Sequence, residues 1–307
     1  MTTFFYQHNT FQFHDPGPGH PECRDRATAA VKAVEGLKNI ETVIADKKAS
    51  DQDLSRIHDE SYVKWLNDID VVSGYVRVDA DTVLSPSSKQ AMFHAAGAGI
   101  MAVDAVMAGH CNTAFTGVRP PGHHAGPNQA MGFCFINNVA VAVEYARHEY
   151  GLKRVAVLDF DVHHGNGTED IFKLSNGLFY ASSHQHPAFP GTGFRSRFDE
   201  NVTIINAPLP PGSGSGEFRD AWDKNIFPEL ERYQPEFIMI SAGFDAHVRD
   251  PLAQLCLGTV DYRWITERIM AMAGKYCQGR VVSFLEGGYD LLALEQSIRT
   301  HVNTLSG

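Results

Sequence analysis

Three aspartates and two histidines stand close together just after an apolar run of this sequence. The run is VAVL, and the segment DFDVHHGNGTED that follows places Asp159, Asp161 and His163 at positions i, i+2 and i+4. Side chains at this spacing point to one side of an extended chain, so Asp161 and His163 could hold one metal ion there. Asp159 would then be free to orient a histidine.

Residues of the same kinds follow three further apolar runs. His123 and His124 come after TAFTGV, Asp245 comes after FIMISAG, and Tyr289 comes after VVSFLEGG. Ligands of an open parallel sheet bind beyond the carboxyl ends of its strands, so these side chains can converge although they are far apart in the sequence. With Asp245 as the third ligand, two carboxylates and one imidazole would leave a divalent ion with open positions for water and substrate. Such an arrangement is typical of catalytic metal sites.

Each of these signals is weak by itself. A lone Asp-x-Asp or His-His pair after a strand more often makes a cap, an ion pair or a turn, and only the combination of four strand ends favours a site. Cys134 is interpreted as a packing residue rather than a nucleophile. Four other histidines stand in helical or turn contexts and are interpreted as structural or surface residues: His58, His94, His148 and His301.

The elements that must position these residues alternate between strands and helices. One helix is expected to begin at Ser85-Pro86, with a serine cap and a first-turn proline, and to end at Gly109; another spans about Ile136 to Tyr150 and ends at Gly151. Further strands are expected at 177–183, 201–206, 236–243 and 280–288, and further helices at 220–233 and 261–274. Short apolar strands without polar alternation indicate an α/β fold with a central, mostly parallel sheet that helices cover on both faces.

Composition and charge fit one globular domain. The chain has 307 residues, of which 43% are hydrophobic, and no linker or charge block divides it, so we expect a single domain over residues 1–307. The net charge of −10 and the lack of any Lys/Arg-rich segment argue against a nucleic-acid partner. No apolar stretch of about 18 residues and no signal peptide is evident, so we expect a cytoplasmic protein that binds no membrane. Five widely spaced cysteines without a CxxC pair argue against a disulfide framework.

Six longer blocks follow one another from about residue 8 to residue 292. They are HDPGPGHPE, RPPGHHAGPNQAMGFCFINN, DFDVHHGNGTEDIF, FPGTG, SAGFDAHVRDPLAQL and LEGGYD. Together they resemble the zinc-dependent histone deacetylase family, nearest its class II-like and bacterial branch of amidohydrolases. The resemblance implies the arginase/deacetylase α/β fold and the hydrolysis of an acetylated amine to acetate and a free amine.

The resemblance also implies the metal sites. The zinc ligands would be Asp161, His163 and Asp245, in agreement with the strand-end argument, although Fe²⁺ or Co²⁺ could accept the same ligands. A potassium ion would lie beside the zinc, held by the backbone carbonyls of Asp159, Asp161 and His163, the Asp161 carboxylate, the Ser182 hydroxyl and the Ser183 carbonyl. A second monovalent ion would lie near Phe172, Ser175 and Leu178.

By the same resemblance, His123 would pair with Asp159, and His124 with Asn166. A carboxylate holds a histidine more cationic than a neutral amide does, so we expect His124 to act as the base toward water and later as the acid toward the leaving amine. Tyr289 would donate its hydroxyl to the substrate carbonyl and, together with the metal ion, polarise it.

Four residues would form the substrate channel in this resemblance. Gly132, Phe133 and Phe189 would line the narrow passage for an acyl-lysine, and Leu252 would lie at its mouth. Polyamine-specific relatives carry an acidic residue at the position of Leu252, whereas protein deacetylases carry an apolar one. The expected substrate is therefore an acetylated lysine of a protein or peptide, with an acetylpolyamine or another small amide as the alternative.

Two further features stay open at the level of sequence. Asp79 or Asp81 could grip the substrate backbone, but the spacing does not choose between them, and a turn cap explains either one equally well. The segment FRSRFDENVTII, residues 194–205, is shorter than is usual in the family and lacks its customary glycines, so we expect a different channel rim there. The sequence does not indicate the oligomeric state.

Overall fold

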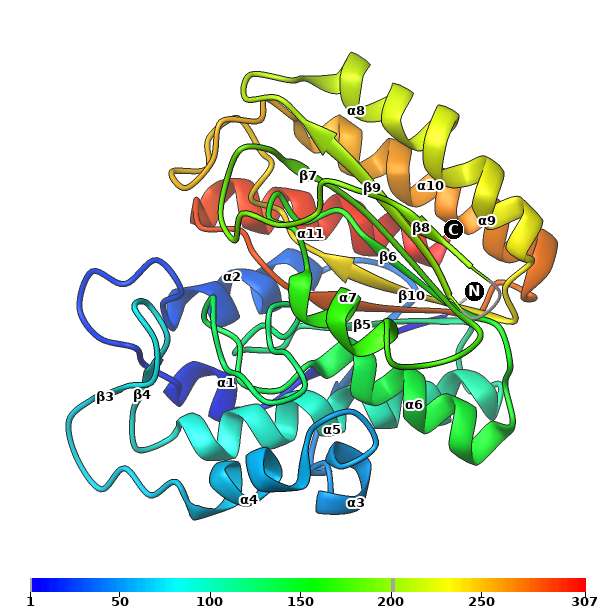
Figure 1. Cartoon of the computed structure of the whole chain (residues 1–307). Coiled ribbons are helices and arrows are strands. Elements are labelled where there is room, and N and C mark those ends of the chain that lie inside the picture. The colour runs from blue at the N-terminus through cyan, green and yellow to red at the C-terminus, as the bar shows by residue number, and fades with distance from the viewer. Residues whose placement is uncertain (1, 200–201) are drawn as a thin grey trace.

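A nine-stranded sheet runs through the centre of the molecule (Figure 1). The computed structural model describes residues 2–199 and 202–307, so Glu200 and Asn201, which belong to the expected rim segment and strand 201–206, lie outside the described residues. The strand order is β2-β1-β5-β11-β10-β6-β7-β9-β8, and every neighbouring pair is parallel except β8 with β9. The expected α/β class with a mostly parallel sheet is confirmed.

The strands of this sheet are short, and a two-stranded hairpin of β3 and β4 lies apart from it. Their bounds are β1 Thr3–Gln7, β2 Ile40–Ile44, β3 Val76–Arg77, β4 Val83–Leu84, β5 Thr113–Thr116, β6 Val155–Asp159, β7 Leu178–Gln185, β8 Arg197–Phe198, β9 Val202–Leu209, β10 Phe237–Ala242 and β11 Val281–Leu285.

Helices cover both faces of the sheet. Figure 1 shows α2, α10 and α11 on one face and α5 and α6 on the other. The helix bounds are α1 Thr10–Phe13, α2 Asp25–Val34, α3 Asp51–Leu54, α4 Glu60–Asp68, α5 Ser88–Met107, α6 Asn138–Tyr150, α7 Asn166–Phe172, α8 Ser215–Ala221, the π-helix η1 Trp222–Ile226, α9 Phe227–Tyr233, α10 Thr259–Tyr276 and α11 Leu291–Ser306. Within the described residues, no helix is both long enough and apolar enough to cross a membrane.

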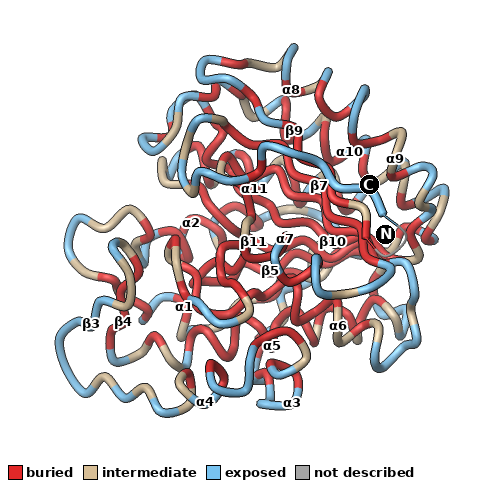
Figure 2. The backbone as a smooth tube through the Cα atoms, in the orientation of Figure 1, coloured by how far each residue is buried: buried red, intermediate tan, exposed pale blue. Residues whose placement is uncertain are grey.

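The two faces explain why the central strands are mostly apolar. In β10, Phe237 and Met239 pack with α5 and α6, whereas Ile238 and Ile240 pack with α10 and α11. Successive side chains of a strand point to opposite faces, so both sets are buried, as the central strands in Figure 2 are. The charged residue of β6, Asp159, accordingly comes only where the strand ends.

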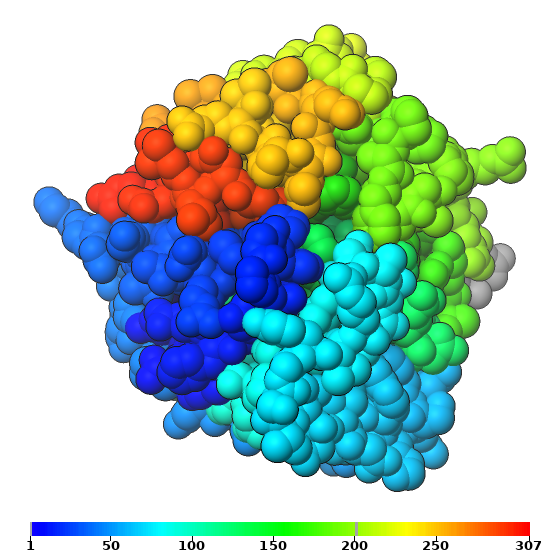
Figure 3. Space-filling view, turned by 90° about the vertical axis from the view of Figure 1, so that its left-hand side faces the viewer, coloured from blue at the N-terminus to red at the C-terminus, as the bar shows by residue number. Residues whose placement is uncertain are grey.

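The four strands that precede the chemically interesting residues are neighbours. β5, β11, β10 and β6 lie side by side in the middle of the sheet, and because they are parallel, their carboxyl ends share one edge. The loops that leave this edge lie on the left of Figure 1, the side that faces the viewer in Figure 3. The sheet therefore gathers the expected residues at one place.

Two helix boundaries differ from the expectation. α5 begins at Ser88 rather than beside Ser85-Pro86, because the Ser85 N–H donates to Ser88 Oγ at 2.8 Å and Ser85 Oγ accepts from the Asp15 N–H at 3.1 Å. These contacts hold the chain in a non-helical loop. The helix expected at 220–233 begins earlier, at Ser215, and passes through the π-helical turn η1 just before Pro228, which lacks an N–H for the regular helical pattern.

Candidate active site

The expected metal ligands lie together just beyond β6 and β10. Asp161, His163 and Asp245 each offer one ligand atom, and these atoms lie within 4.8 Å of one another. His163 Nδ1 is 3.2 Å from Asp161 Oδ1 and 3.1 Å from Asp245 Oδ2. β6 ends at Asp159, so the two ligands of this segment belong to the loop after the strand rather than to an extended strand. These three residues could hold a metal ion.

Backbone N–H groups fix the outer oxygens of both carboxylates. The Gly287 N–H donates to Asp161 Oδ2 at 2.8 Å, and the Val162 N–H donates to Asp245 Oδ1 at 2.9 Å. Burial and the charge of Asp161 raise the pKa of Asp245 to about 7. A divalent cation would relieve this repulsion, so two oriented carboxylates and one imidazole fit a divalent metal.

Two glycines leave the space that this cluster occupies. A Cβ on Gly287 would lie 2.1 Å from Asp245 Oδ2 and 2.6 Å from Asp161 Oδ2, and a Cβ on Gly243 would lie 2.0 Å from Asp161 Oδ2. Any side chain at either position would displace an oxygen of one of these two carboxylates. The glycines that follow β10 and β11 are therefore part of the site.

The two neighbouring histidines have different partners. His123 Nδ1 lies 3.0 Å from Asp159 Oδ2, and His124 Nδ1 lies 2.8 Å from Asn166 Oδ1. Tyr180 also donates its hydroxyl to Asp159 Oδ2, at 3.0 Å. The two imidazole rings are 4.0 Å apart, so the charge of one acts directly on the other.

The different partners separate the two pKa values. Burial lowers the pKa of His123, but the charges of Asp161, Asp159 and Glu286 outweigh burial and raise it to about 10. Burial and the neighbouring charges of His123 and His163 lower the pKa of His124 well below its usual value. These environments favour the cationic form of His123 and the neutral form of His124.

A cavity of about 260 Å³ leads from the surface to this cluster. Tyr289 lies on its wall, and burial raises the pKa of its hydroxyl well above the usual value, so the hydroxyl keeps its proton. The Phe133 ring meets the Tyr289 ring edge-on at 5.8 Å. The residues that line the cavity are Pro21, Asp81, His124, Gly132, Phe133, His163, Phe189, Leu252 and Tyr289.

The mouth of this cavity is apolar and partly exposed. Phe189 is 42% exposed and Leu252 is 41% exposed, so both can contact a ligand that enters. Gly132 has φ +55°, and a Cβ there would lie 2.5 Å from the His124 ring. All four expected channel residues thus line one cavity. Asp81 also lines it, whereas Asp79 lines a different cavity.

The residues named for the monovalent ions lie near β7. Ser182 pairs with Asp159 in the sheet, and its hydroxyl lies 2.9 Å from His184 Nδ1. Ser183 follows it in the same strand. The other three occupy the connection from α7 to β7: Phe172 ends the helix, Leu178 begins the strand, and Ser175 lies between them.

Glu286, which the sequence reasoning did not select, supports the histidine loop. Its Oε2 accepts from the N–H groups of Gly122 and His123 at 2.7 and 3.2 Å, and its Oε1 accepts from Ser241 Oγ at 3.0 Å. One buried carboxylate thereby joins the ends of three strands. The available signal was a glutamate that ends an apolar run, just as the recognised aspartates do.

Further buried charges lie behind Tyr289. The Arg26 guanidinium lies 5.0 Å from the centre of the Tyr289 ring, and Arg26 Nε donates to the Gly288 carbonyl at 2.7 Å. Glu22 pairs with Arg26 at 3.0 Å and with Arg119 Nη2 at 2.7 Å. This network fixes the backbone that carries Tyr289.

Asp250 connects Tyr289 to the channel mouth. Its carboxylate accepts from the Tyr289 N–H at 2.7 Å and from the Leu252 N–H at 3.0 Å. Asp250 therefore links the backbone of Tyr289 to the backbone of Leu252 at the cavity mouth.

The chain is similar to a known protein family and to several of its members. The family model for the histone deacetylase domain matches residues 20–305. The chain is 39% identical over 310 residues to "Histone deacetylase 14, chloroplastic" of Arabidopsis thaliana, with 94% of this chain and 73% of that protein covered. It is 38% identical to a "Probable deacetylase" of Archaeoglobus fulgidus, with 95% and 82% covered, and 37% identical to a "Histone deacetylase-like amidohydrolase" of Pseudomonas aeruginosa, with 88% and 73% covered. The crystal structure of the HDA15 HD domain superposes with a TM-score of 0.92 at 30% identity, covering 100% of this chain and 88% of that chain.

Proposed function

Since the chain belongs to the histone deacetylase family, we propose that this hydrolase is zinc-dependent and removes acetyl groups from lysine side chains of proteins or peptides. The observation that carries the proposal is the cavity of about 260 Å³ that joins an apolar mouth to the metal-ligand cluster, the neutral His124 and Tyr289. The apolar residues at its mouth suit the hydrocarbon stem of an acyl-lysine, and its inner end suits an amide.

The metal ion would be held by Asp161, His163 and Asp245 and, when bound, supplies Lewis acidity to the reacting oxygens. Zinc suits this set of ligands, and Fe²⁺ or Co²⁺ would be accepted as well. Potassium would lie beside this cluster, at Asp159, Ser182 and the neighbouring carbonyls.

In this proposal, one side chain transfers protons and two others stabilise the developing charge. Neutral His124 takes the proton from the attacking water on Nε2, because its Nδ1 faces Asn166, and later gives that proton to the leaving amine. Tyr289, which keeps its proton, donates a hydrogen bond to the substrate oxygen as negative charge develops there. Cationic His123 stabilises the same charge and is oriented by Asp159. The products are acetate and the free amine.

We assign the substrate backbone contact to Asp81 rather than Asp79. Asp81 lies at the cavity that would hold the acyl-lysine, and its carbonyl accepts from His20 Nε2 at 2.9 Å, which ties its loop to the opposite rim. A carboxylate at the mouth can accept from the N–H groups of a peptide that lies across it.

The alternative is hydrolysis of acetylpolyamines or other small amides by the same site. The half-exposed Leu252 favours the lysine substrate, because it offers no charge to the distant ammonium of a polyamine and can pack on a lysine stem. The deciding experiment compares kcat/KM for acetyl-lysine peptides, longer acyl-lysine peptides and N-acetylated polyamines. A preference for acetylated polyamines would refute the lysine assignment and leave a metal-dependent amidohydrolase.

A further inference from the structure

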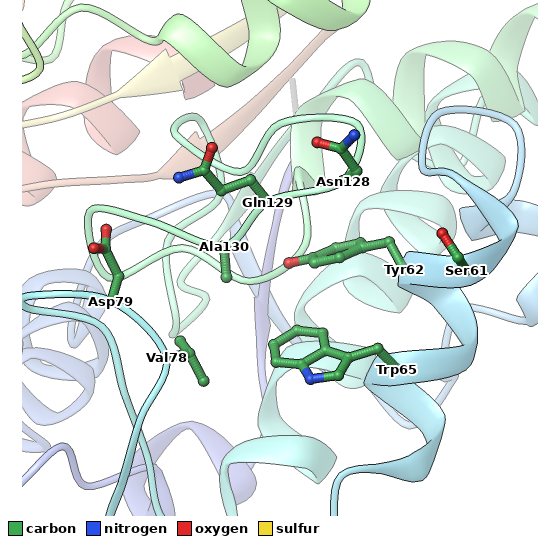
Figure 4. Close-up of a pocket in the computed structure, with 8 residues that line it drawn as sticks. All are labelled: Ser61, Tyr62, Trp65, Val78, Asp79, Asn128, Gln129 and Ala130. Atoms are coloured by element: carbon green, nitrogen blue, oxygen red, sulfur yellow. The ribbon is translucent and has the colours of Figure 1, made fainter.

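A second cavity, of about 390 Å³, lies beside the proposed channel (Figure 4). Helix α4 contributes the rings of Tyr62 and Trp65 on one side, and Val78 and Asp79 lie opposite, with the loop 128–130 above them. None of the roles assigned so far uses this cavity.

The same two chain segments form the wall between both cavities. Asp79 and Ala130 line the second cavity, whereas Asp81 and Gly132, each two residues further along, line the channel. The segments are joined where the Phe133 N–H donates to Thr82 Oγ1 at 3.1 Å. Both segments bend between these residues, so the two cavities lie close together. Side chains i and i+2 of an extended peptide are roughly 7 Å apart. A peptide with its acetyl-lysine in the channel can therefore place a side chain two positions away in the second cavity.

The aromatic side of this cavity is rigid. The Tyr62 and Trp65 rings stack with their centres 5.2 Å apart and their planes 27° apart, and the Tyr62 hydroxyl donates to the Phe135 carbonyl at 2.7 Å. Tyr62 is buried, and Trp65 is only partly buried, so the indole presents its surface to the cavity. A fixed aromatic face of this kind attracts a cation, and a planar guanidinium in particular.

The opposite side supplies a carboxylate without a cationic partner. Asp79 Oδ1 accepts the Ala80 N–H at 2.6 Å, and across residues 2–199 and 202–307 no lysine or arginine forms an ion pair with it. The nearest arginine in sequence, Arg77, donates to the Ala80 carbonyl at 2.8 Å instead. A cavity lined by a carboxylate on one side and aromatic rings on the other is a suitable environment for a guanidinium.

We propose that this cavity is a specificity subsite for an arginine side chain of the substrate, two residues before or after the acetylated lysine. The inference rests on the proposed lysine deacetylase function and names a preference within it. The guanidinium stacks on Trp65, and its N–H groups donate to Asp79. A single contact of this type in a partly exposed cavity is expected to raise kcat/KM about 5- to 10-fold.

The test uses acetyl-lysine peptides that carry arginine or citrulline two positions before or after the acetyl-lysine. Citrulline keeps the shape of arginine but lacks its charge, so the ratio of the two kcat/KM values isolates the cation. The wild-type enzyme should prefer arginine about 5- to 10-fold at one of the two positions. Asp79→Asn and, independently, Trp65→Leu should bring that ratio close to one.

Glu267→Gln is the matched control, because Glu267 is exposed on α10 and its replacement changes the net charge by the same amount. This variant should keep the wild-type ratio. Hydrolysis of both peptides at equal kcat/KM would overturn the subsite and leave the deacetylase function intact. A preference for arginine that survives both Asp79→Asn and Trp65→Leu would also overturn it. Failure to hydrolyse any acetyl-lysine peptide would instead overturn the proposed function.

Discussion

His124 and Asn166 face each other through an imidazole nitrogen and an amide oxygen that are 2.8 Å apart. The adjacent His123 faces a carboxylate instead, that of Asp159. Because an amide carries no charge, the hydrogen bond to Asn166 only partly offsets burial and the charges of His123 and His163, which lower the pKa of His124. A neutral partner at residue 166 is therefore consistent with His124, rather than His123, as the proposed base.

Replacement of Asn166 by aspartate should move the activity to higher pH. The new carboxylate raises the pKa of His124, and since the base must be neutral, the acidic limb of the kcat/KM profile should shift upward by about one to three units. Rates measured from pH 5 to 9 give this limb directly. Asn303→Asp, an exposed change of the same charge on α11, should leave the profile in place. An unshifted limb in Asn166→Asp would remove His124 from the role of base.

Replacement of Asp245 by alanine should abolish both metal retention and turnover. Asp245 supplies one of the three ligand atoms, and the remaining two are too few for tight binding of a divalent ion. Elemental analysis after dialysis, together with the rate of peptide deacetylation, checks both effects. Asp70→Ala, which removes an exposed carboxylate, should keep the metal. Full occupancy and normal turnover in Asp245→Ala would refute the ligand assignment.

Replacement of Tyr289 by phenylalanine should lower kcat about a hundredfold or more while substrate still binds. The ring keeps its contacts with Arg26 and Phe133, so the melting temperature should change little. Single-turnover rates, together with separate measurements of substrate binding, test whether only kcat changes. A variant with wild-type kcat would exclude the hydroxyl from the reaction.

Replacement of Leu252 by glutamate should favour acetylated polyamines over acetyl-lysine peptides. Leu252 is 41% exposed at the mouth, so the change should not unfold the protein, and a half-exposed ion pair with the polyamine ammonium should shift the ratio of kcat/KM values about fivefold. Leu252→Gln separates the charge from the loss of the apolar side chain. If both variants lower the melting temperature and impair both substrates alike, Leu252 is a packing residue rather than a specificity residue.

Acid should destabilise the fold through two buried histidines away from the metal site. Burial lowers the pKa of His58 to about 4 and that of His301 to about 3. The unfolded chain binds protons at these positions below about pH 6.5 while the folded protein does not, so stability present above pH 6.5 is lost as the pH falls. Urea unfolding at pH 7 and pH 5 should show a loss of about 2 kcal/mol for each histidine.

Variants can assign this pH dependence. His301→Gln should reduce it, because it removes one of the buried histidines that cause it, whereas the exposed His148→Gln should not. Equal slopes for His301→Gln and the wild-type protein would contradict the assignment.

The sequence predicted the sheet and the convergence of its strand ends because both depend on local patterns. Apolar runs such as VAVL mark strands that are buried on both faces, and the residues after them must then share one edge. The start of α5 was predicted wrongly, because the contacts of Ser85 with Ser88 and with the distant Asp15 decide it.

The buried charges behind the site could not be predicted in the same way. Glu22 and Arg119 are 97 positions apart, and their pairing becomes visible only when the loop before α2 meets the loop after β5. The site roles that rest on the family resemblance alone stay predictions. The single domain over residues 1–307 also stays a prediction.

The closeness of Gly243 and Gly287 to the carboxylates has a consequence for mutational scanning of this protein. Neither residue has a side chain that could react, yet an added methyl group at either one would lie within 2.1 Å of a carboxylate oxygen of Asp161 or Asp245. A library scored by growth or turnover should therefore tolerate alanine at these two positions as poorly as it tolerates loss of Asp161 or Asp245. Positions that do not tolerate substitution would therefore include those where a side chain does not fit, in addition to those whose side chain takes part in the reaction.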